Sequence, residues 1–398
     1  MDFPSSGGRR LSIDDLDTTK LLAHARQQAE ERQLDSMLIV DVDTHHDEAS
    51  SLREIIDHID DPVQRQIAMS GSGGGRRPLV PRNISYEDGA GRVPRIAFGL
   101  NRTEQVPDNT HRSLALSRRA MDAMGVDYAC LLPTTVMRLG MQPKKDFEVA
   151  LATAYNRWLA EVALPEEPRA RGMLYLPLYD ADVCLETVEQ LGDKPGVVGC
   201  VIASPRYASV HHNSFARTYA AMEERGLVLA FHGGANWTDR TMGLFNKFLS
   251  VQAVSGPHFN TVHLTNWLIN GMPERFPNLK LMWMESGIAW AVAAMLRLDN
   301  EYMMRSFDAP GLKRRPSSYM REMFFSTQPL ERPEDMGLLE SLFRALKAET
   351  QLVWGSNFPG PDFDLPSVVA DLPFLSDEAK RNILGGTAAK LFRLPEAS

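Results

Sequence analysis

Short apolar runs alternate with stretches of helical periodicity along most of the chain. Eight of these runs have the length and the composition of buried β-strands. We expect strands at residues 36–43, 127–133, 172–177, 199–203, 227–232, 279–285, 323–326 and 352–356. The flanking stretches predict helices at residues 11–32, 111–124, 147–163, 182–191, 215–224, 261–275 and 377–392.

Strands that alternate with helices are joined by crossover connections and therefore lie parallel. Eight such units favour an α/β fold of the (β/α)8 TIM-barrel type. The alternative, a doubly wound open sheet, favours a glycine-rich turn after the first strand, whereas the sequence there reads DTHHDE, without glycine. We therefore predict one barrel domain over residues 36–398, preceded by a tail and a helix over residues 1–35.

Residues 61–110 interrupt the regular pattern. They contain the run SGSGGGRR and few periodic apolar positions. We expect an insert after the first strand that covers or flanks the barrel mouth, because long connections of this kind are usually functional. Inserts beside a mouth often determine substrate specificity.

The composition narrows the class of partner. The chain has 398 residues, with 43 basic and 51 acidic side chains and a formal net charge of −8. An acidic chain without a long basic run is unsuited to binding nucleic acid. No apolar stretch approaches the ~18 residues of a membrane span, and the N-terminus lacks the apolar core of a signal peptide. We therefore expect a cytoplasmic protein that binds a small-molecule substrate and neither nucleic acid nor a membrane.

The cysteines indicate a reducing environment. Cys130, Cys184 and Cys200 lie in apolar strand-like or helical runs. An odd number without CxxC spacing argues against a disulfide framework and against a cysteine-based zinc site. We expect three reduced, buried thiols.

Polar residues at the predicted strand ends are the candidates for chemistry, because a barrel enzyme builds its active site there. Asp43 and His45 follow the first strand, His232 ends the fifth, Glu285 ends the sixth and Asn357 follows the eighth. Carboxylates and imidazoles that converge at a barrel mouth suit a divalent transition metal. A carboxylate amid Trp and Met, such as Glu285, is costly to bury unless it is paired or bound to a metal.

Other residues are secondary candidates. Glu48 and His258 are possible further ligands, and His263 is a possible catalytic residue. His258 and His263 are five residues apart, so on a helix at most one of them faces the site. Structural roles are the alternatives: an Asp–X–His segment can cap a helix or form a turn, and His232 can be a satisfied core histidine.

The rim of the mouth offers candidates for substrate binding. Arg206 and Arg240 follow the fourth and fifth strands, and Trp237 lies in the same loop as Arg240. A guanidinium can hold a substrate carboxylate through two hydrogen bonds, although a solvated surface arginine is the commoner outcome.

Several segments occur in an order that resembles a known family. They are VDVDTHHDE from Val40, AYNRWLAE from Ala154, FHGG from Phe231, ERFPNLKLMWMESGIAW from Glu274, FSTQPLE from Phe325, GSNFP from Gly355 and ILGGTAAKLF from Ile383. The series is similar to the amidohydrolase-related family that includes aminocarboxymuconate semialdehyde decarboxylase and benzoate-type decarboxylases. The resemblance extends from about residue 36 to residue 394.

The resemblance implies a metal-dependent enzyme. It implies a (β/α)8 barrel with one divalent metal, usually zinc or manganese, and decarboxylation or hydrolysis of a small carboxylated or amide substrate. With the donor set of the strand ends, we expect zinc, with iron or manganese as alternatives. The family's first-strand motif falls on Asp43 and His45, and its strand-five histidine falls on His232. It also implies an oligomer, either of identical chains or with a related barrel subunit.

The sequence departs from the family pattern at three positions. Glu285 stands where founding members have a second histidine, Asn357 stands where the last ligand is an aspartate, and Gly360 replaces a following histidine. Asparagine offers a carbonyl oxygen to a metal but is no base near neutral pH. Glu285, His263 and Asn357 are therefore the candidate catalytic residues, with the role of Asn357 altered.

Two alternative functions remain open. One is a non-haem iron or manganese oxygenase subunit, because relatives on this fold such as 2-aminoisobutyrate hydroxylase look like metal oxygenases built from two related subunits. The other is a partner subunit that keeps only a structural metal in a heteromeric complex. Asn357 and Gly360 favour these alternatives relative to an ordinary family member.

Overall fold

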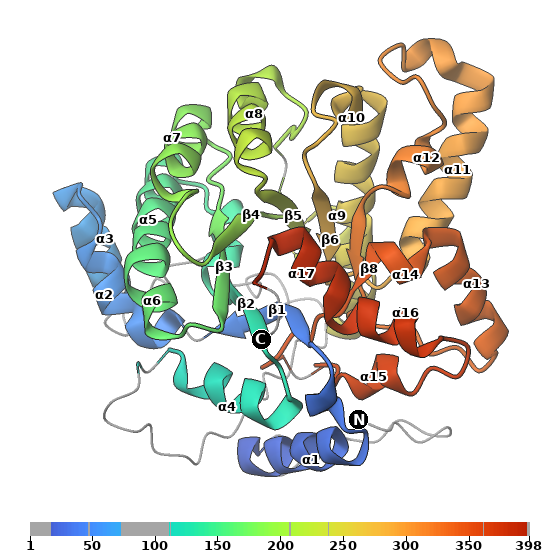
Figure 1. Ribbon diagram of the computed structural model, residues 1–398. Coiled ribbons are helices and arrows are strands. Elements are labelled where there is room, and N and C mark those ends of the chain that lie inside the picture. The colour runs from blue at the N-terminus through green and yellow to red at the C-terminus, as the bar shows by residue number, and fades with distance from the viewer. Residues whose placement is uncertain are drawn as a thin grey trace.

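Eight parallel strands form a barrel at the centre of the molecule, and helices surround it (Figure 1). The computed structural model describes residues 17–46, 48–72, 111, 113–206, 208–237, 239–360 and 362–395. The strands pair in chain order, and every neighbouring pair is parallel. They are β1 (Val40–His46), β2 (Tyr128–Pro133), β3 (Ala170–Tyr175), β4 (Val197–Ala203), β5 (Val228–His232), β6 (Leu281–Met284), β7 (Phe324–Ser326) and β8 (Leu352–Val353).

The ring closes between β8 and β1. The N–H of Val42 donates to the carbonyl oxygen of Trp354 over 3.1 Å, and the N–H of His45 donates to that of Phe358 over 2.7 Å. Backbone N–H and C=O groups that are buried at a sheet edge need hydrogen-bond partners. The closure provides these partners, so β1 is paired on both sides. It fixes the strand that carries two candidate ligands.

The helices cover the outside of the barrel. In Figure 1, α1 and α4 lie side by side below the strands, where they pack against each other. The α-helices are α1 (Thr18–Glu31), α2 (Leu52–Asp57), α3 (Pro62–Ser72), α4 (Ala115–Met124), α5 (Lys145–Trp158), α6 (Leu164–Glu166), α7 (Ala181–Leu191), α8 (Ala216–Arg225), α9 (Phe248–Ile269), α10 (Met272–Arg275), α11 (Ala289–Arg305), α12 (Pro316–Met320), α13 (Met336–Leu346), α14 (Ala348–Gln351), α15 (Ser367–Ala370), α16 (Asp377–Arg381) and α17 (Thr387–Phe392).

Alternation along the strands separates the barrel interior from the layer under the helices. On β5, Phe231 packs face to face on Trp283 with ring centroids 4.4 Å apart and belongs to the apolar layer shared with the outer helices. Its neighbours Val228 and Ala230 belong to the other large buried cluster. Since successive side chains on a strand point to opposite faces, His232 lies on the same side as Ala230.

The predicted (β/α)8 barrel is confirmed. Seven strands lie within a few residues of their expected positions, whereas the first is β1 at Val40–His46 and not residues 36–43. Asp43 and His45 therefore lie within the strand. The shift arises because Thr44–His46, which read as a polar turn, pair with the end of β2 and with the segment after β8.

One further expectation about the chain needed correction, and one stays a prediction. The insert expected at residues 61–110 begins with a helix, α3 (Pro62–Ser72), whose Ala68 is fully buried; residues 73–110 lie outside the described part, so the insert stays a prediction. The helix predicted at 261–275 begins earlier, at Phe248, because Pro257 stands within it without ending it. Pattern reading also missed α11 and α13.

Two expectations from composition can be compared with the structure. The three cysteines are buried and free, as expected. No helix in the described ranges is both long and apolar enough to cross a membrane.

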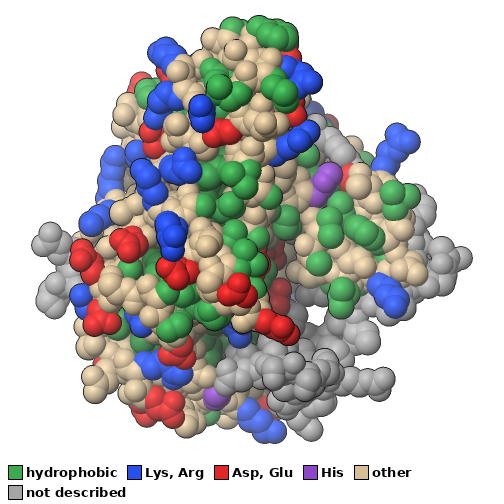
Figure 2. Space-filling model, turned by 90° about the vertical axis from the view of Figure 1, so that its right-hand side faces the viewer, with side chains coloured by type: hydrophobic (Ala, Val, Ile, Leu, Met, Phe, Trp, Pro, Cys, Tyr) green, Lys and Arg blue, Asp and Glu red, His purple; other side chains and the backbone are tan. Residues whose placement is uncertain are grey.

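One face of the molecule carries large exposed apolar side chains. Figure 2 shows the side of Figure 1 on which α11 and α13 lie, and hydrophobic side chains gather in a band there. On and just beyond α11, Leu296 is 71% exposed and Phe307 is 75% exposed. Exposed apolar patches are typical of surfaces that contact another protein, and the oligomer expected from the sequence stays a prediction.

Candidate metal centre

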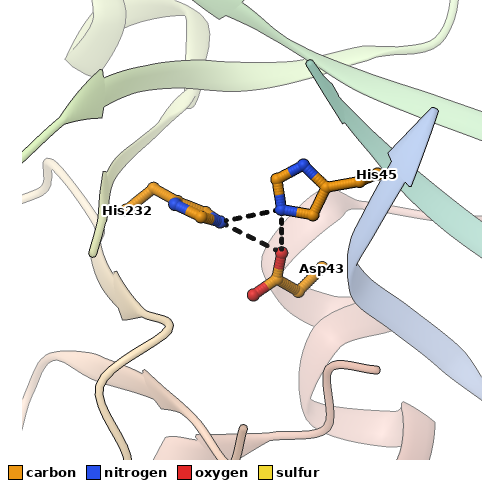
Figure 3. A group of neighbouring side chains, drawn as sticks. All are labelled: Asp43, His45 and His232. Atoms are coloured by element: carbon orange, nitrogen blue, oxygen red, sulfur yellow. Dashed lines mark hydrogen bonds and ion pairs between the residues drawn. The ribbon is translucent and has the colours of Figure 1, made fainter. Parts of the chain in front are cut away.

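Two strands place three candidate ligands in one part of the barrel interior. Asp43 and His45 are two residues apart on β1, so both side chains leave the same face of the strand. His232 is the last residue of β5. Figure 3 shows the three side chains converging from these two strands.

The converging atoms form a compact triangle of Asp43 Oδ1, His45 Nε2 and His232 Nε2, which we call the ligand triangle. Its edges are 3.2 Å between the two imidazole nitrogens, 3.3 Å from His232 to Asp43 and 3.5 Å from His45 to Asp43. Ligands that bind one metal at about 2.1 Å lie about 3.0 Å apart in octahedral and about 3.4 Å apart in tetrahedral geometry. The triangle therefore has the size of one face of a metal coordination shell.

The hydrogen bonds of the two imidazoles fix which nitrogen has a free lone pair. His45 Nδ1 lies 3.1 Å from the carbonyl oxygen of Pro133, and His232 Nδ1 lies 2.8 Å from that of Gly233. A carbonyl only accepts, so each Nδ1 carries the proton and each Nε2 carries a lone pair in the neutral ring. Two lone pairs then face each other over 3.2 Å, which is unfavourable unless a proton or a cation lies between them.

The charges around the triangle favour a cation. Burial raises the pKa of Asp43, but His232 and His45 outweigh it and hold that pKa below its usual range. Burial and the neighbouring His232 lower the pKa of His45 to about 4, so this ring is neutral at neutral pH. Burial opposes protonation of His232, yet Glu285 and Asp43 raise its pKa to about 9. The site thus retains one proton that a metal would displace.

The remaining oxygen of Asp43 supports the same interpretation. Oδ2 is buried and has no hydrogen-bond partner among the described residues. A buried carboxylate oxygen without a partner costs free energy unless a positive charge is close. The donor set of one carboxylate and two imidazoles suits zinc, iron or manganese. By size, lone-pair direction and charge, these residues fit a divalent metal.

Glu285 lies beside the triangle and not in it. Its Oε2 is 3.3 Å from Nδ1 of His232, which is the ring nitrogen opposite the triangle. The residue follows β6 with φ 50°, a left-handed conformation that is uncommon for glutamate. Its carbonyl oxygen leaves no room for a side chain at Gly233, where a Cβ would come within 2.4 Å. A carboxylate in this position orients an imidazole ligand and increases its basicity.

Asn357 joins the loop after β8 to β1. Its backbone N–H donates to the carbonyl oxygen of Asp43 over 2.7 Å, and its Nδ2 donates to Asp362 Oδ1 over 3.2 Å. Its φ of 56° is left-handed, which asparagine tolerates better than most residues. A Cβ at Gly360 would lie 2.7 Å from the Asn357 carbonyl oxygen, so the family's histidine does not fit this loop.

Glu48 and His258 lie apart from the triangle. The carboxylate of Glu48 is buried and accepts the N–H groups of Thr134 and Val136 at 3.0 Å each, which ties the start of the barrel mouth to the loop after β2. His258 is half-buried on α9, where its ring meets Phe259 edge to face. In the structure, the contacts of both side chains are therefore with residues outside the triangle.

His263 lies on the helix side of the barrel wall. Its ring is tilted against Phe231 at 5.7 Å between centroids, and its Nε2 is 2.8 Å from the carbonyl oxygen of Ser204. Since Phe231 and His232 point to opposite faces of β5, His263 is separated from the triangle by the strand. Burial lowers its pKa to about 4. The catalytic role expected of His263 stays a prediction, which this position does not favour.

The three rim candidates differ in their surroundings. The indole of Trp237 is buried, and its N–H donates to the carbonyl oxygen of Phe245 over 3.1 Å within a small apolar cluster. Arg240 is exposed. Arg206 is buried, and its Nη2 donates to Oε1 of Glu148 over 3.3 Å. Arg206 is thus the rim candidate with a defined polar environment.

Sequence reasoning missed several polar residues that shape the mouth. Asn156 holds the end of β3, because its side chain exchanges hydrogen bonds of 2.7 and 2.8 Å with the backbone of Tyr175. Asn260 on α9 donates to the carbonyl oxygen of Met284 and so supports the end of β6. The sequence does hold a sign that Glu148 is buried, because this residue shares the apolar face of its helix with Leu151 at i+3.

Comparisons with known proteins agree with this fold. A family model described as amidohydrolase matches residues 42–394. The 5-carboxyvanillate decarboxylase of Sphingomonas paucimobilis has 21% sequence identity and a TM-score of 0.62, over 90% of this chain and 100% of that one. An amidohydrolase of Mycobacterium avium subsp. paratuberculosis K-10 has 19% identity and a TM-score of 0.68, over 89% and 99% of the two chains.

A further similar structure contains a metal. It is the dihydroxybenzoic acid decarboxylase of Polaromonas sp. JS666, with bound manganese and the inhibitor 2-nitroresorcinol. It has 16% identity and a TM-score of 0.59, over 91% of this chain and 98% of that one. At such identities the likeness shows a shared fold.

Proposed function

This chain belongs to the amidohydrolase family, and on that premise we propose that it is a metal-dependent decarboxylase of a small aromatic carboxylic acid. The observation that carries the proposal is the ligand triangle, whose edges of 3.2 to 3.5 Å fit one divalent metal. Similar structures include decarboxylases of aromatic acids, one of them with manganese. Manganese, zinc and iron all suit the donor set.

Asp43, His45 and His232 would hold the metal. When bound, the metal supplies positive charge that polarises the substrate oxygens. His232 has the further support of Glu285 at Nδ1, so the ring keeps its orientation when a ligand binds at Nε2.

The reaction needs a proton at the ring carbon. The bond between that carbon and the carboxylate breaks, CO2 leaves, and the electron pair left on the carbon takes up a proton. We assign the delivery of this proton to Glu285: its carboxylate, which is charged in the resting site, would take up a proton from solvent, to which its side chain is 17% exposed, and pass it to the ring carbon. Asn357 cannot act as a base near neutral pH, and this favours decarboxylation over hydrolysis through that position.

The proposal is tested by turnover of a panel of hydroxybenzoic and hydroxy-isophthalic acids. Protein loaded with Mn²⁺, Zn²⁺ or Fe²⁺ is assayed anaerobically for CO2 release and for the decarboxylated ring. We expect turnover with at least one metal and one acid, and none for His232→Ala. Amide hydrolysis without any CO2 release would contradict the proposal.

A second candidate is an oxygenase, and one observation favours it. Two histidines and one carboxylate are the ligand set of many non-haem iron(II) oxygenases, and the ligand triangle has this composition. The same panel, run with Fe²⁺, a reductant and oxygen, distinguishes the two reactions. Oxygen uptake with a hydroxylated product supports the oxygenase. If neither reaction occurs although metal is bound, a partner subunit with a structural metal is the remaining candidate.

A further inference from the structure

A second buried polar cluster lies on the barrel wall between the two strands of the ligand triangle. Arg206 follows β4, Tyr175 ends β3, and Glu148 lies in the first turn of α5, which follows β2. The N–H of Ser204, which directly follows β4, donates to the carbonyl oxygen of His232 over 2.9 Å, so the segment that leads to Arg206 adjoins the triangle. The cluster belongs to the same carboxyl-terminal rim.

The contacts of this cluster leave donors without acceptors. Arg206 Nη2 is 3.3 Å from Glu148 Oε1, and Tyr175 Oη is 3.5 Å from the same oxygen. The side chain of Arg206 is only 2% exposed, yet its Nε and Nη1 have no hydrogen-bond partner in the described structure. A guanidinium has five N–H donors, and leaving several of them buried and unpaired is costly.

Gly140 lies next to the guanidinium of Arg206. A Cβ added at Gly140, in the 3-10 turn Val136–Met141 after β2, would come no closer than 3.7 Å to Nη1 and 3.5 Å to Tyr175 Oη. The ring of Tyr179 lies 5.7 Å from the guanidinium carbon. A glycine and two tyrosines are therefore among the described neighbours of this guanidinium.

The charge of Arg206 is only partly compensated. Burial raises the pKa of Glu148 to about 7 in spite of Arg206, so near neutral pH this carboxyl group is protonated for much of the time. The unpaired groups on Arg206 are donors. An anionic oxygen is the chemistry that would satisfy them.

We propose that Arg206, positioned by Glu148 and Tyr175, is a second anion-binding subsite, and that the preferred substrate carries another acidic group besides the one that meets the metal. The inference rests on the proposed function for the identity of that first group. The ligand class is an aromatic acid with two anionic substituents. Glu148 and Tyr175 are positioning residues in this account, because they act through Arg206.

The test compares isophthalate, which has two carboxylates, with benzoate, which has one. Dissociation constants are measured by titration calorimetry at pH 7 on the full chain as purified. We expect wild-type protein to bind isophthalate at least tenfold more tightly than benzoate. Arg206→Met should abolish this preference and leave benzoate binding unchanged, whereas Arg240→Met, the matched change at an exposed arginine, should preserve it.

Two further measurements guard against a merely structural effect. Because Arg206→Met leaves Glu148 buried without its partner, the double variant Glu148→Gln/Arg206→Met removes both groups and should show the same loss. Binding of isophthalate should also take up protons onto Glu148, seen as a dependence of the measured heat on the buffer, and Glu148→Gln should remove that dependence.

The outcomes separate the two proposals. A preference for isophthalate that survives in Arg206→Met or in the double variant overturns the subsite, and so does wild-type protein that shows no preference or binds neither acid. If the preference depends on Arg206 while the protein neither binds metal nor releases CO2, the subsite stands and the proposed decarboxylase fails.

Discussion

Two buried clusters on the same rim each combine a carboxylate with nitrogen groups, yet they call for opposite ligands. In the ligand triangle, Asp43 stays ionised between two imidazoles, and the unpaired atoms carry lone pairs. In the Arg206 cluster, burial holds the pKa of Glu148 near 7, and the guanidinium has N–H donors that no described residue accepts. Unpaired lone pairs recruit a cation, whereas unpaired donors recruit an anion.

This contrast shows that a buried carboxyl group does not by itself decide which ligand a polar cluster binds. Asp43 and Glu148 are both fully buried carboxyl groups. What differs is the neighbour: His232 can give up its extra proton and neutral His45 already offers a lone pair, while Arg206 stays protonated. The side chains beside each carboxyl group therefore decide whether its cluster binds a cation or an anion.

The largest effect is expected from the ligand triangle itself. His232→Ala and Asp43→Ala each remove one of three ligands, so bound metal should fall from about one per chain to less than a tenth of that. Metal is measured by mass spectrometry after incubation with Mn²⁺ and gel filtration. His258→Ala, a histidine outside the triangle, is the control and should keep its metal. Full metal content in both triangle variants would remove the proposed centre.

Glu285 offers a graded test of the same cluster. Glu285→Gln keeps the size of the side chain but removes the charge that supports His232. We expect the dissociation constant for Mn²⁺ to rise about 10- to 100-fold, as for other groups that hold an imidazole ligand. Glu340→Gln on the exposed face of α13 is the matched control. An unchanged constant in Glu285→Gln would leave this carboxylate without a role in metal binding.

Glu148 tests the other cluster through pH. Its pKa rises from 4.5 to about 7 on folding, so the folded chain holds an extra proton between these values. This group's contribution to stability therefore falls as pH rises through that window. Relative to Glu148→Gln, wild type should lose about 1.5 kcal/mol of unfolding free energy between pH 5 and 6.5. Urea denaturation at each pH measures it, and parallel curves for the two proteins would contradict the prediction.

The smallest effect is expected at Asn357. Asn357→Asp restores the family's acid, but it would set two carboxylates face to face, since Nδ2 now donates to Asp362 over 3.2 Å. The double variant Asn357→Asp/Asp362→Asn preserves that hydrogen bond with the partners exchanged. We expect a gain of severalfold in CO2 release from aromatic acids. No gain in the double variant would show that Asn357 is not what limits this activity.

Much of the architecture followed from the sequence. Apolar runs separated by helical periods predict parallel strands, because buried strands in such folds are apolar on both faces. The exact start of β1 did not follow. Thr44–His46 look like a polar turn, and only pairing with β2 and with the loop after β8 makes them a strand.

The direction of the site's side chains was predictable within a strand but not beyond the end of the strand. Asp43 and His45 share a face because they are two residues apart in one strand. Glu285 and Asn357 come just after their strands, in left-handed conformations, so alternation no longer fixes where their side chains point. Likewise, the pairing of Arg206 with Glu148 joins residues 58 positions apart, which no local pattern reveals.

Electron paramagnetic resonance of the Mn²⁺-loaded protein tests the metal centre most directly, because hyperfine coupling to ¹⁴N reports imidazole ligands independently of turnover. The account predicts one bound Mn²⁺ per chain with two coordinated imidazole nitrogens. It also predicts that His45→Ala, if it still binds metal, retains only one of them. Bound Mn²⁺ without nitrogen coupling, or with the same coupling in His45→Ala, would contradict the account.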